Sequence, residues 1–200
     1  TKVQRGRAKA VNFGVPYGRT AITIAQEHNM TVQEAQELIN TWAKTYPQAW
    51  AYLEACAQLA LDGKAIRSPM GRYKRPGLIT PDTVDGIKNE YKNYTIQSTV
   101  AEFTLLAVIE LMGMLDPREA FIVNEVHDSV VFEVLDDPEV IQRNCDTILK
   151  VMGSIPKRYL GWDLPFKSDV EVGYTWADIV DIKEFLENRE KLKAESLALL

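Results

Sequence analysis

Residues 5–18 read RGRAKAVNFGVPYG, and every fourth position in this stretch carries a side chain suited to ligand binding. The four side chains are Arg5, Lys9, Phe13 and Tyr17. Steps of four residues advance by only about 40° around an α-helix, so all four fall on one face roughly 120° wide. That face presents two cations, an aromatic ring and a phenol, an order that matches the phosphates and then the base and sugar of a nucleoside triphosphate. An amphipathic helix with solvated cations would show the same spacing, so both interpretations stay open for this stretch alone.

A second informative stretch, FIVNEVHDSVVFEV, covers residues 121–134. Two runs rich in Val and Phe flank the polar centre His127-Asp128-Ser129, a pattern typical of an antiparallel hairpin with a tight turn. Asp128 then lies at the hairpin tip, where its carboxylate can face a metal ion instead of a core. Taken alone, an Asp in such a position more often serves the turn itself.

Together the two stretches resemble motifs of the family A (polymerase-I-like) DNA polymerases. Residues 5–18 match the fingers-helix pattern R-x3-K-x3-F-x3-YG, and VHDSVVFEV is similar to the palm motif His-Asp-Glu between apolar strands. The resemblance implies the following nucleotide-binding residues: Arg5, Lys9, Phe13 and Tyr17. It implies a catalytic role for Lys9 at the leaving pyrophosphate and for Asp128 as a ligand of two magnesium ions. Tyr17, Gly18 and His127 are expected to contact DNA.

Three weaker matches follow the order of the family. The segment 68–75, SPMGRYKR, looks like the basic segment before the palm, and it implies a DNA contact for Arg72. Asn93 and Gln97 resemble an Asn-x3-Gln pair that contacts DNA in the minor groove, whose acceptors are nearly independent of sequence. DVEVGYTWADI, at 169–179, is similar to the closing strand of the family. The resemblance covers roughly residues 3–180, so 183–200 either adds to a partner surface or forms a solvated tail.

Several positions depart from the family pattern. Ser129 replaces the usual Glu and matches the His-Asp-Ser of single-subunit phage-type RNA polymerases, which tend to carry Met in place of Phe13. Asn89 stands where the family often has an Arg, which puts a primer-strand contact in question. Pro16 is expected to lie inside the fingers helix and to kink it just before Tyr17.

The largest departure concerns the second metal-binding Asp of the family, which belongs to an Asp-Tyr-Ser-like segment upstream of the fingers helix. The 200 residues contain no such segment, and the thumb has no match either. We therefore expect the carboxyl-terminal portion of a DNA-directed DNA polymerase, split or fragmentary, that needs a second polypeptide or segment for activity. The alternatives are a non-catalytic DNA- or replisome-binding remnant and a fragment of a single-subunit RNA polymerase.

Charge is unevenly distributed along the chain, although the net charge is −5. Residues 1–19 and residues 63–75 each hold five basic and no acidic side chains, whereas residues 76–200 hold 12 basic and 23 acidic ones. Such segregation predicts nucleic-acid or triphosphate contacts at the two basic segments. The sequence has no run of 18 apolar residues and no signal-peptide pattern, and Cys56 and Cys145 are expected to be reduced. We expect a protein of the cytoplasm, either of its own cell or of an infected host, with an organelle as the open alternative and with no membrane partner.

Hydrophobic periodicity predicts an α+β fold. Together with the resemblance to a right-hand polymerase, this pattern implies helical fingers over 1–62, a portion of an antiparallel-sheet palm over 63–180, and a helical extension over 181–200. Helices are predicted near 5–17, 20–28, 32–43, 47–62, 85–114, 137–152 and 177–198, with a hairpin at 121–134 and a strand at 167–173.

Overall fold

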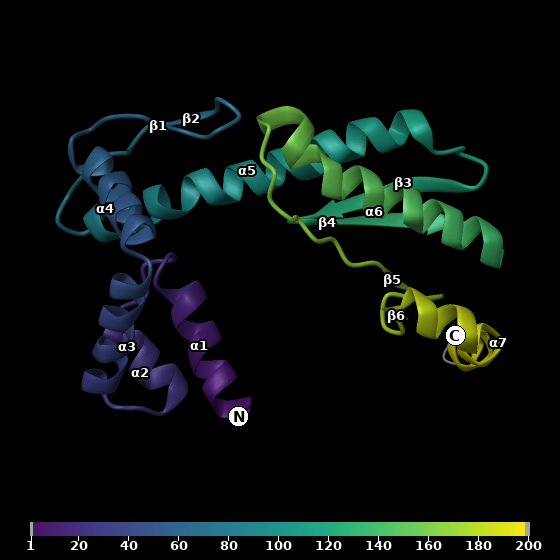
Figure 1. Cartoon of the computed structure of the whole chain (residues 1–200), viewed down its shortest axis with the longest axis horizontal. Helices are drawn as coiled ribbons and strands as arrows, with labels where there is room; N and C mark the ends of the chain where they lie inside the picture. Colours follow the sequence, from purple (N-terminus) through teal and green to yellow (C-terminus); the bar gives the residue numbers. More distant parts are fainter. Residues whose placement is uncertain (1, 199–200) are drawn as a thin grey trace. The chain divides into compact units, whose positions relative to one another are not determined.

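A computed structural model describes the backbone of residues 2–198 and the side chains of this range except those at 2–4, 7 and 10. Helices dominate, and the strands of the described part form three two-stranded antiparallel sheets (Figure 1). The elements are α1 (Lys2–Gly14), α2 (Ala21–His28), α3 (Val32–Thr45), α4 (Pro47–Leu61), β1 (Ile66–Arg67), β2 (Tyr73–Lys74), α5 (Val84–Met114), β3 (Ala120–Val126), β4 (Ser129–Val134), α6 (Pro138–Leu160), β5 (Glu171–Val172), β6 (Val180–Asp181) and α7 (Ile182–Leu197). The predicted α+β class is confirmed.

The chain forms two compact units, Thr1–Thr99 and Val100–Leu200, and their boundary falls within α5. The division predicted from the sequence, with boundaries near residues 62 and 180, stays a prediction.

Packing of the first helices decides which face of α1 is exposed. Val11 and Val15 are buried at 5% and 6% exposure, in a core with Ile24 of α2 and Ile39 of α3. A capping box at Thr31, reciprocated by Glu34, fixes the start of α3. Because the apolar stripe of α1 faces α2 and α3, the opposite stripe is left to solvent.

Helix α1 ends earlier than its sequence predicts. The helix stops at Gly14, and residues 15–18 form a turn closed by Gly18 N–H donating to Val15 O (3.0 Å) and Arg19 N–H to Gly14 O (2.9 Å). Pro16 has no N–H to donate to the Asn12 carbonyl, so the helix ends before it. The expected kink inside the helix is therefore wrong, and Pro16 and Tyr17 belong to the turn. We call residues 15–18 the corner.

The second half of the first unit holds a basic hairpin against α5. Strands β1 and β2 pair Ile66 with Lys74 and Arg67 with Tyr73. Tyr91 of α5 is fully buried, and its hydroxyl donates to the carbonyls of Lys64 (2.9 Å) and Lys74 (3.2 Å). By length and composition, α5 is the one described helix that could cross a membrane, a test that helices in protein cores also pass.

The second unit is built on the hairpin β3–β4 and helix α6. The ladder runs from Ala120↔Val134 to Val126↔Ser129, with a bulge between Ile122 and Asn124. Helix α6 begins at an Asp137 N-cap and continues to Leu160, eight residues beyond the predicted end. Gly153 and Pro156 read as helix breakers, but Ile155 is fully buried and tertiary packing carries the helix past them.

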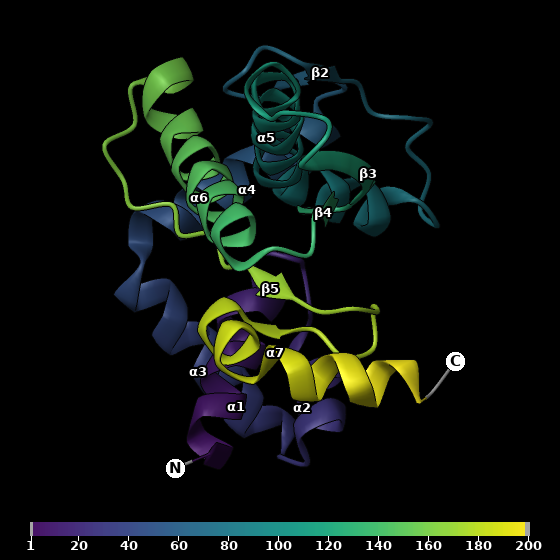
Figure 2. The ribbon, with the colours of Figure 1, turned by 90° about the vertical axis from the view of Figure 1, so that its right-hand side faces the viewer.

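The last helix packs against its own unit. Helix α7 follows directly on β6 and lies beside the β5–β6 hairpin (Figure 2). Phe185 is 1% exposed and packs with Ile141 and Cys145 of α6. The interpretation as a solvated tail is therefore wrong, because this helix buries one apolar face. The predicted strand at 167–173 shortens to β5, and the helix begins at 182 because Val180 and Asp181 pair with β5.

Candidate functional site

The exposed face of α1 carries three of the predicted nucleotide-binding side chains. Arg5 and Lys9 are exposed, and Phe13 is 59% exposed. The Lys9 ammonium lies 5.8 Å from the centroid of the Phe13 ring, a weak cation–π contact. Among the described side chains, neither Arg5 nor Lys9 is paired with a carboxylate. Both cations are therefore available to an anionic ligand, beside an aromatic face.

The corner brings Tyr17 and Gly18 against α5. Gly18 has a φ of +75°, and a β-carbon at this position would lie 1.9 Å from Oδ1 of Asn89. Gln97, two turns further along α5, donates from Nε2 to the Tyr17 hydroxyl. Gly18 is therefore required both for its backbone conformation and for the close approach of Asn89.

The α5 amides line a shallow cavity of about 390 Å³. Asn89, Asn93 and Gln97 recur every four residues, and Asn93 Nδ2 donates to the Asn89 carbonyl at 3.0 Å. Lys74 reaches the same cavity from β2, where its ammonium pairs with Glu90 at 2.9 Å. The structure thus brings the predicted DNA-binding residues Asn93 and Gln97 together with the corner.

Arg72 lies in the turn of the basic hairpin. Ser68 and Arg72 close this turn, with Ser68 N–H donating to the Arg72 carbonyl (2.8 Å) and Arg72 N–H to Ser68 Oγ (3.1 Å). The Arg67 guanidinium lies 5.1 Å from the Tyr73 ring centroid. Arg72 and Arg75 are exposed, so the hairpin presents positive charge to solvent.

His127 and Asp128 belong to the other compact unit, where they form the two-residue turn between β3 and β4. His127 has a φ of +59° and Asp128 does not share this sign, a pattern typical of a type II′ turn, which usually has Gly first. A non-glycine residue in such a conformation costs about 1–2 kcal/mol. The Asp128 side chain is exposed, and within the described residues its carboxylate has no hydrogen-bond or ion-pair partner.

Metal binding has limited support from these residues. Asp128 offers the hard oxygen donor that magnesium prefers. However, the described part of the chain contains no group of three or more His, Cys, Asp or Glu side chains that could hold a metal ion. One carboxylate does not complete a magnesium site, so further ligands would have to come from elsewhere.

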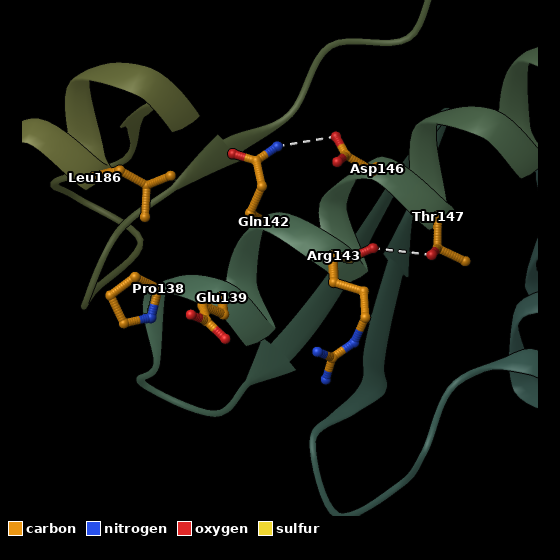
Figure 3. Close-up of a pocket in the computed structure, with 7 residues that line it drawn as sticks. All are labelled: Pro138, Glu139, Gln142, Arg143, Asp146, Thr147 and Leu186. Atoms are coloured by element: carbon orange, nitrogen blue, oxygen red, sulfur yellow. Dashed lines mark hydrogen bonds between the residues drawn. The ribbon is translucent and has the colours of Figure 1, made fainter.

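A larger open groove of about 630 Å³ lies along α6 and is unrelated to these residues (Figure 3). Most of its polar side chains already have partners: Gln142 donates to Asp146 at 2.9 Å, and Arg143 is bound to Glu119 at 2.6 Å. Leu186 of α7 closes one side. The groove results from the docking of α7, and none of the predicted site residues lines it.

Sequence reasoning treated Asn89 only as a departure from a family pattern, whereas the structure places it at the centre of the site. The i, i+4, i+8 spacing of three amides at 89, 93 and 97 was the available signal. The contact of Asn89 with Gly18, 71 residues away in the sequence, follows from the packing of the fold and has no local sequence signal.

Comparisons with known proteins agree with the motifs. The model of DNA polymerase family A matches residues 1–178. The thermostable DNA polymerase I of Thermus filiformis is 25% identical over 181 residues, covering 87% of this chain and 20% of the relative. DNA polymerase I of Geobacillus stearothermophilus is 28% identical over 183 residues, with 89% and 20% covered. The chain thus spans about a fifth of the length of these relatives.

A solved structure supports the fold independently. The POL domain of Pol1 from M. smegmatis, in complex with DNA primer-template and dNTP, superimposes with a TM-score of 0.66 at 22% identity. The superposition covers 78% of this chain and 28% of that one. With its family match over residues 1–178, the chain belongs to DNA polymerase family A.

Proposed function

We propose that this chain is the nucleotide- and DNA-binding portion of a DNA-directed DNA polymerase, and that it extends a primer together with a further segment or chain. The observation that carries the proposal is the exposed face of α1, where Arg5 and Lys9, neither of them paired with a carboxylate among the described side chains, lead through Phe13 to the corner and the α5 amides. A helix that only exposes solvated cations would not require Gly18 of the corner to pack closely against the amide side chains of α5.

Each part of this surface has a task in nucleotidyl transfer. Arg5 and Lys9 bind the triphosphate oxygens through charge-assisted hydrogen bonds, and Lys9 neutralises or protonates the leaving pyrophosphate. Phe13 packs against the sugar and base. The structural relative from M. smegmatis was solved with dNTP and primer-template, which is the ligand pair that this surface would take.

DNA contacts are assigned to the corner, to the α5 amides beside it and to the basic hairpin. Asn93 and Gln97 donate to minor-groove acceptors, which lie in similar places in every base pair, so binding is independent of sequence. Arg72 and its basic neighbours neutralise backbone phosphates, which makes the affinity dependent on salt. His127 joins the DNA contacts at the hairpin tip.

Asp128 is proposed as a magnesium ligand. Magnesium, when bound, stabilises the attacking 3′ oxygen and the leaving pyrophosphate. Asp128 is the one match in this sequence to the two metal-binding Asp residues of the family, so a partner or further segment would supply the second.

The hairpin offers a place for such a segment. A two-stranded hairpin alone is marginally stable, and Phe121 and Val123 of β3 are 45% and 48% exposed. An added strand would cover this apolar surface and the unpaired strand edge. The site of action would be the cytoplasm, where DNA and dNTP meet, in a cell or in a phage-infected host.

Nucleotide binding tests the proposal on the chain by itself. Lys9→Ala is expected to weaken binding of a fluorescent dNTP with Mg2+ by about tenfold or more, the loss of one charge-assisted hydrogen bond. Lys44→Ala, at an exposed lysine near the end of α3, is the matched control and should leave binding unchanged. Equal affinities for the unaltered chain and Lys9→Ala would contradict the assignment. Primer-template binding with no measurable dNTP binding would instead favour a DNA-binding remnant.

A further inference from the structure

The corner is held on α5 by two contacts of different kinds. Asn89 meets Gly18, and Gln97 meets Tyr17. The two amides lie eight residues apart on one stripe of the helix, about 12 Å at 1.5 Å per residue. The corner therefore spans two turns of α5. We call the contact of Asn89 with Gly18 the lower contact and that of Gln97 with Tyr17 the upper contact.

The lower contact is steric. The entire amide group of Asn89 lies against Gly18, because a β-carbon there would fall 1.9 Å from Oδ1, 2.3 Å from Cγ and 2.8 Å from Nδ2. The backbone beside it is closed by the hydrogen bond from Arg19 N–H to Gly14 O. Such close packing fixes the position of the corner without a hydrogen bond that a ligand could take over.

The upper contact is exchangeable. Tyr17 is 45% exposed and Gln97 is also exposed, so their hydrogen bond competes with water and contributes little net free energy. Gln97 Nε2 is at the same time the donor that a minor-groove acceptor would need. Asn93, between the two contacts, has its Nδ2 engaged with the Asn89 carbonyl.

We propose that the Tyr17 hydroxyl occupies Gln97 in the DNA-free chain, and that duplex DNA must displace it while Asn89 and Gly18 keep the corner in place. The proposal rests on the proposed function in that it takes Gln97 as a DNA contact. Tyr17 is then a gate at the DNA surface, and its hydroxyl lowers the affinity for primer-template in the resting chain.

A double-mutant cycle on DNA affinity tests the gate. Tyr17→Phe keeps the ring and removes the hydroxyl, so it should strengthen binding of a labelled primer-template by about 2- to 10-fold, the factor for one exposed hydrogen bond. In a Gln97→Ala background the same change should have no effect. Tyr46→Phe, at another half-exposed tyrosine (50%), is the matched control and should not alter affinity. Weaker DNA binding by Tyr17→Phe, or an equal gain in the Gln97→Ala background, would overturn the proposal.

A measurement without DNA separates the gate from the proposed function. In the free chain labelled with 15N, Tyr17→Phe should shift the side-chain amide resonances of Gln97 and leave in place those of Gln58 of α4, which donates to Asp62. If no variant binds primer-template, the proposed function fails and this shift still tests the contact. Unchanged Gln97 resonances would show that the hydroxyl does not hold the amide, and the gate would be rejected.

Discussion

Gly18 determines how the corner meets α5 at the scale of a single residue. Its φ of +75° lies in the left-handed region, which costs other residues about 1–2 kcal/mol. Gly63 has a similar φ of +67°, but a β-carbon there would meet nothing within 4 Å. The two glycines therefore separate the cost of backbone conformation from the cost of close approach.

Gly18→Ala is expected to lower the free energy of unfolding by about 2–3 kcal/mol, and Gly63→Ala by about 1 kcal/mol. The difference arises because Asn89 must rotate away from the added methyl group. Adding Asn89→Ala to Gly18→Ala should reduce the loss in free energy of unfolding to about that of Gly63→Ala. Urea denaturation of the unaltered chain, the two glycine variants and the double variant measures this. Equal destabilisation by the two glycine variants would show that the Asn89 contact is loose.

Residue spacing predicted which face of α1 is exposed. The opposite side of this stretch is apolar, and Val11 and Val15 there pack against α2 and α3. It did not predict where the helix ends. A proline can be tolerated inside a helix or can follow one, and the neighbouring sequence does not distinguish the two cases. Here Gly18, with its φ of +75°, closes a turn directly after the helix, so Pro16 follows the helix.

Helix α7 lies beyond the family match, and Asp136 at the end of the β3–β4 hairpin binds it. This carboxylate accepts hydrogen bonds from Arg189 (2.7 Å), Lys193 (2.7 Å) and Tyr174 (3.1 Å). The hydrogen bonds from Arg189 and then Lys193 hold the pKa of Asp136 well below its ordinary value, while partial burial opposes them. Asp136 thus links α7 to the end of β4, the second strand of the hairpin.

Asp136→Asn should destabilise the docked α7 by about 1 kcal/mol at pH 7, the size expected for a partly exposed ion pair. A carboxylate with a lowered folded pKa stabilises the fold above its unfolded pKa of about 3.9, and this stabilisation is lost as the pH falls through the folded value. The difference between the unaltered chain and Asp136→Asn should therefore be constant from pH 7 to about 5 and shrink below pH 4.

Hydrogen exchange of the α7 amides at several pH values measures this difference. Asp163→Asn is the control, because its ion pair with Lys157 is largely exposed on both sides (85% and 69%). A difference that grows on acidification would have the wrong sign for the Asp136 network.

Element types were well predicted in α3, where the periodicity is strong and a capping box marks the start, in α4, which opens at Pro47, in the long helix α5 and in the β3–β4 hairpin. Ends were not predicted where long-range packing outweighs local breakers, as at Pro156 in α6, or where a short strand pairs first, as at Val180 before α7. The bulge at Val123 also has no local signal in an apolar strand.

At the scale of the whole molecule, the candidate residues are divided between the two compact units. The first unit carries the exposed face of α1, the corner and the basic hairpin, and the second carries His127 and Asp128 on a two-stranded hairpin. The proposed nucleotidyl transfer would use both sets, together with a second carboxylate for which this sequence has no match. The proposed activity therefore belongs to an assembly in which this chain supplies about a fifth of the length of a polymerase of the kind it resembles.

Magnesium-dependent primer extension by that assembly is the most direct measurement of whether the chain contributes catalytic groups. The chain is combined with a polypeptide that carries the second metal-binding Asp segment proposed above, and extension of a labelled primer is followed with and without Mg2+. Asp128→Asn should abolish extension while the assembly stays intact, whereas Asp163→Asn should extend at the rate of the unaltered chain. Extension that survives Asp128→Asn at an unchanged rate would contradict the assignment of this carboxylate to catalysis, and robust extension by the isolated chain would contradict the need for a partner.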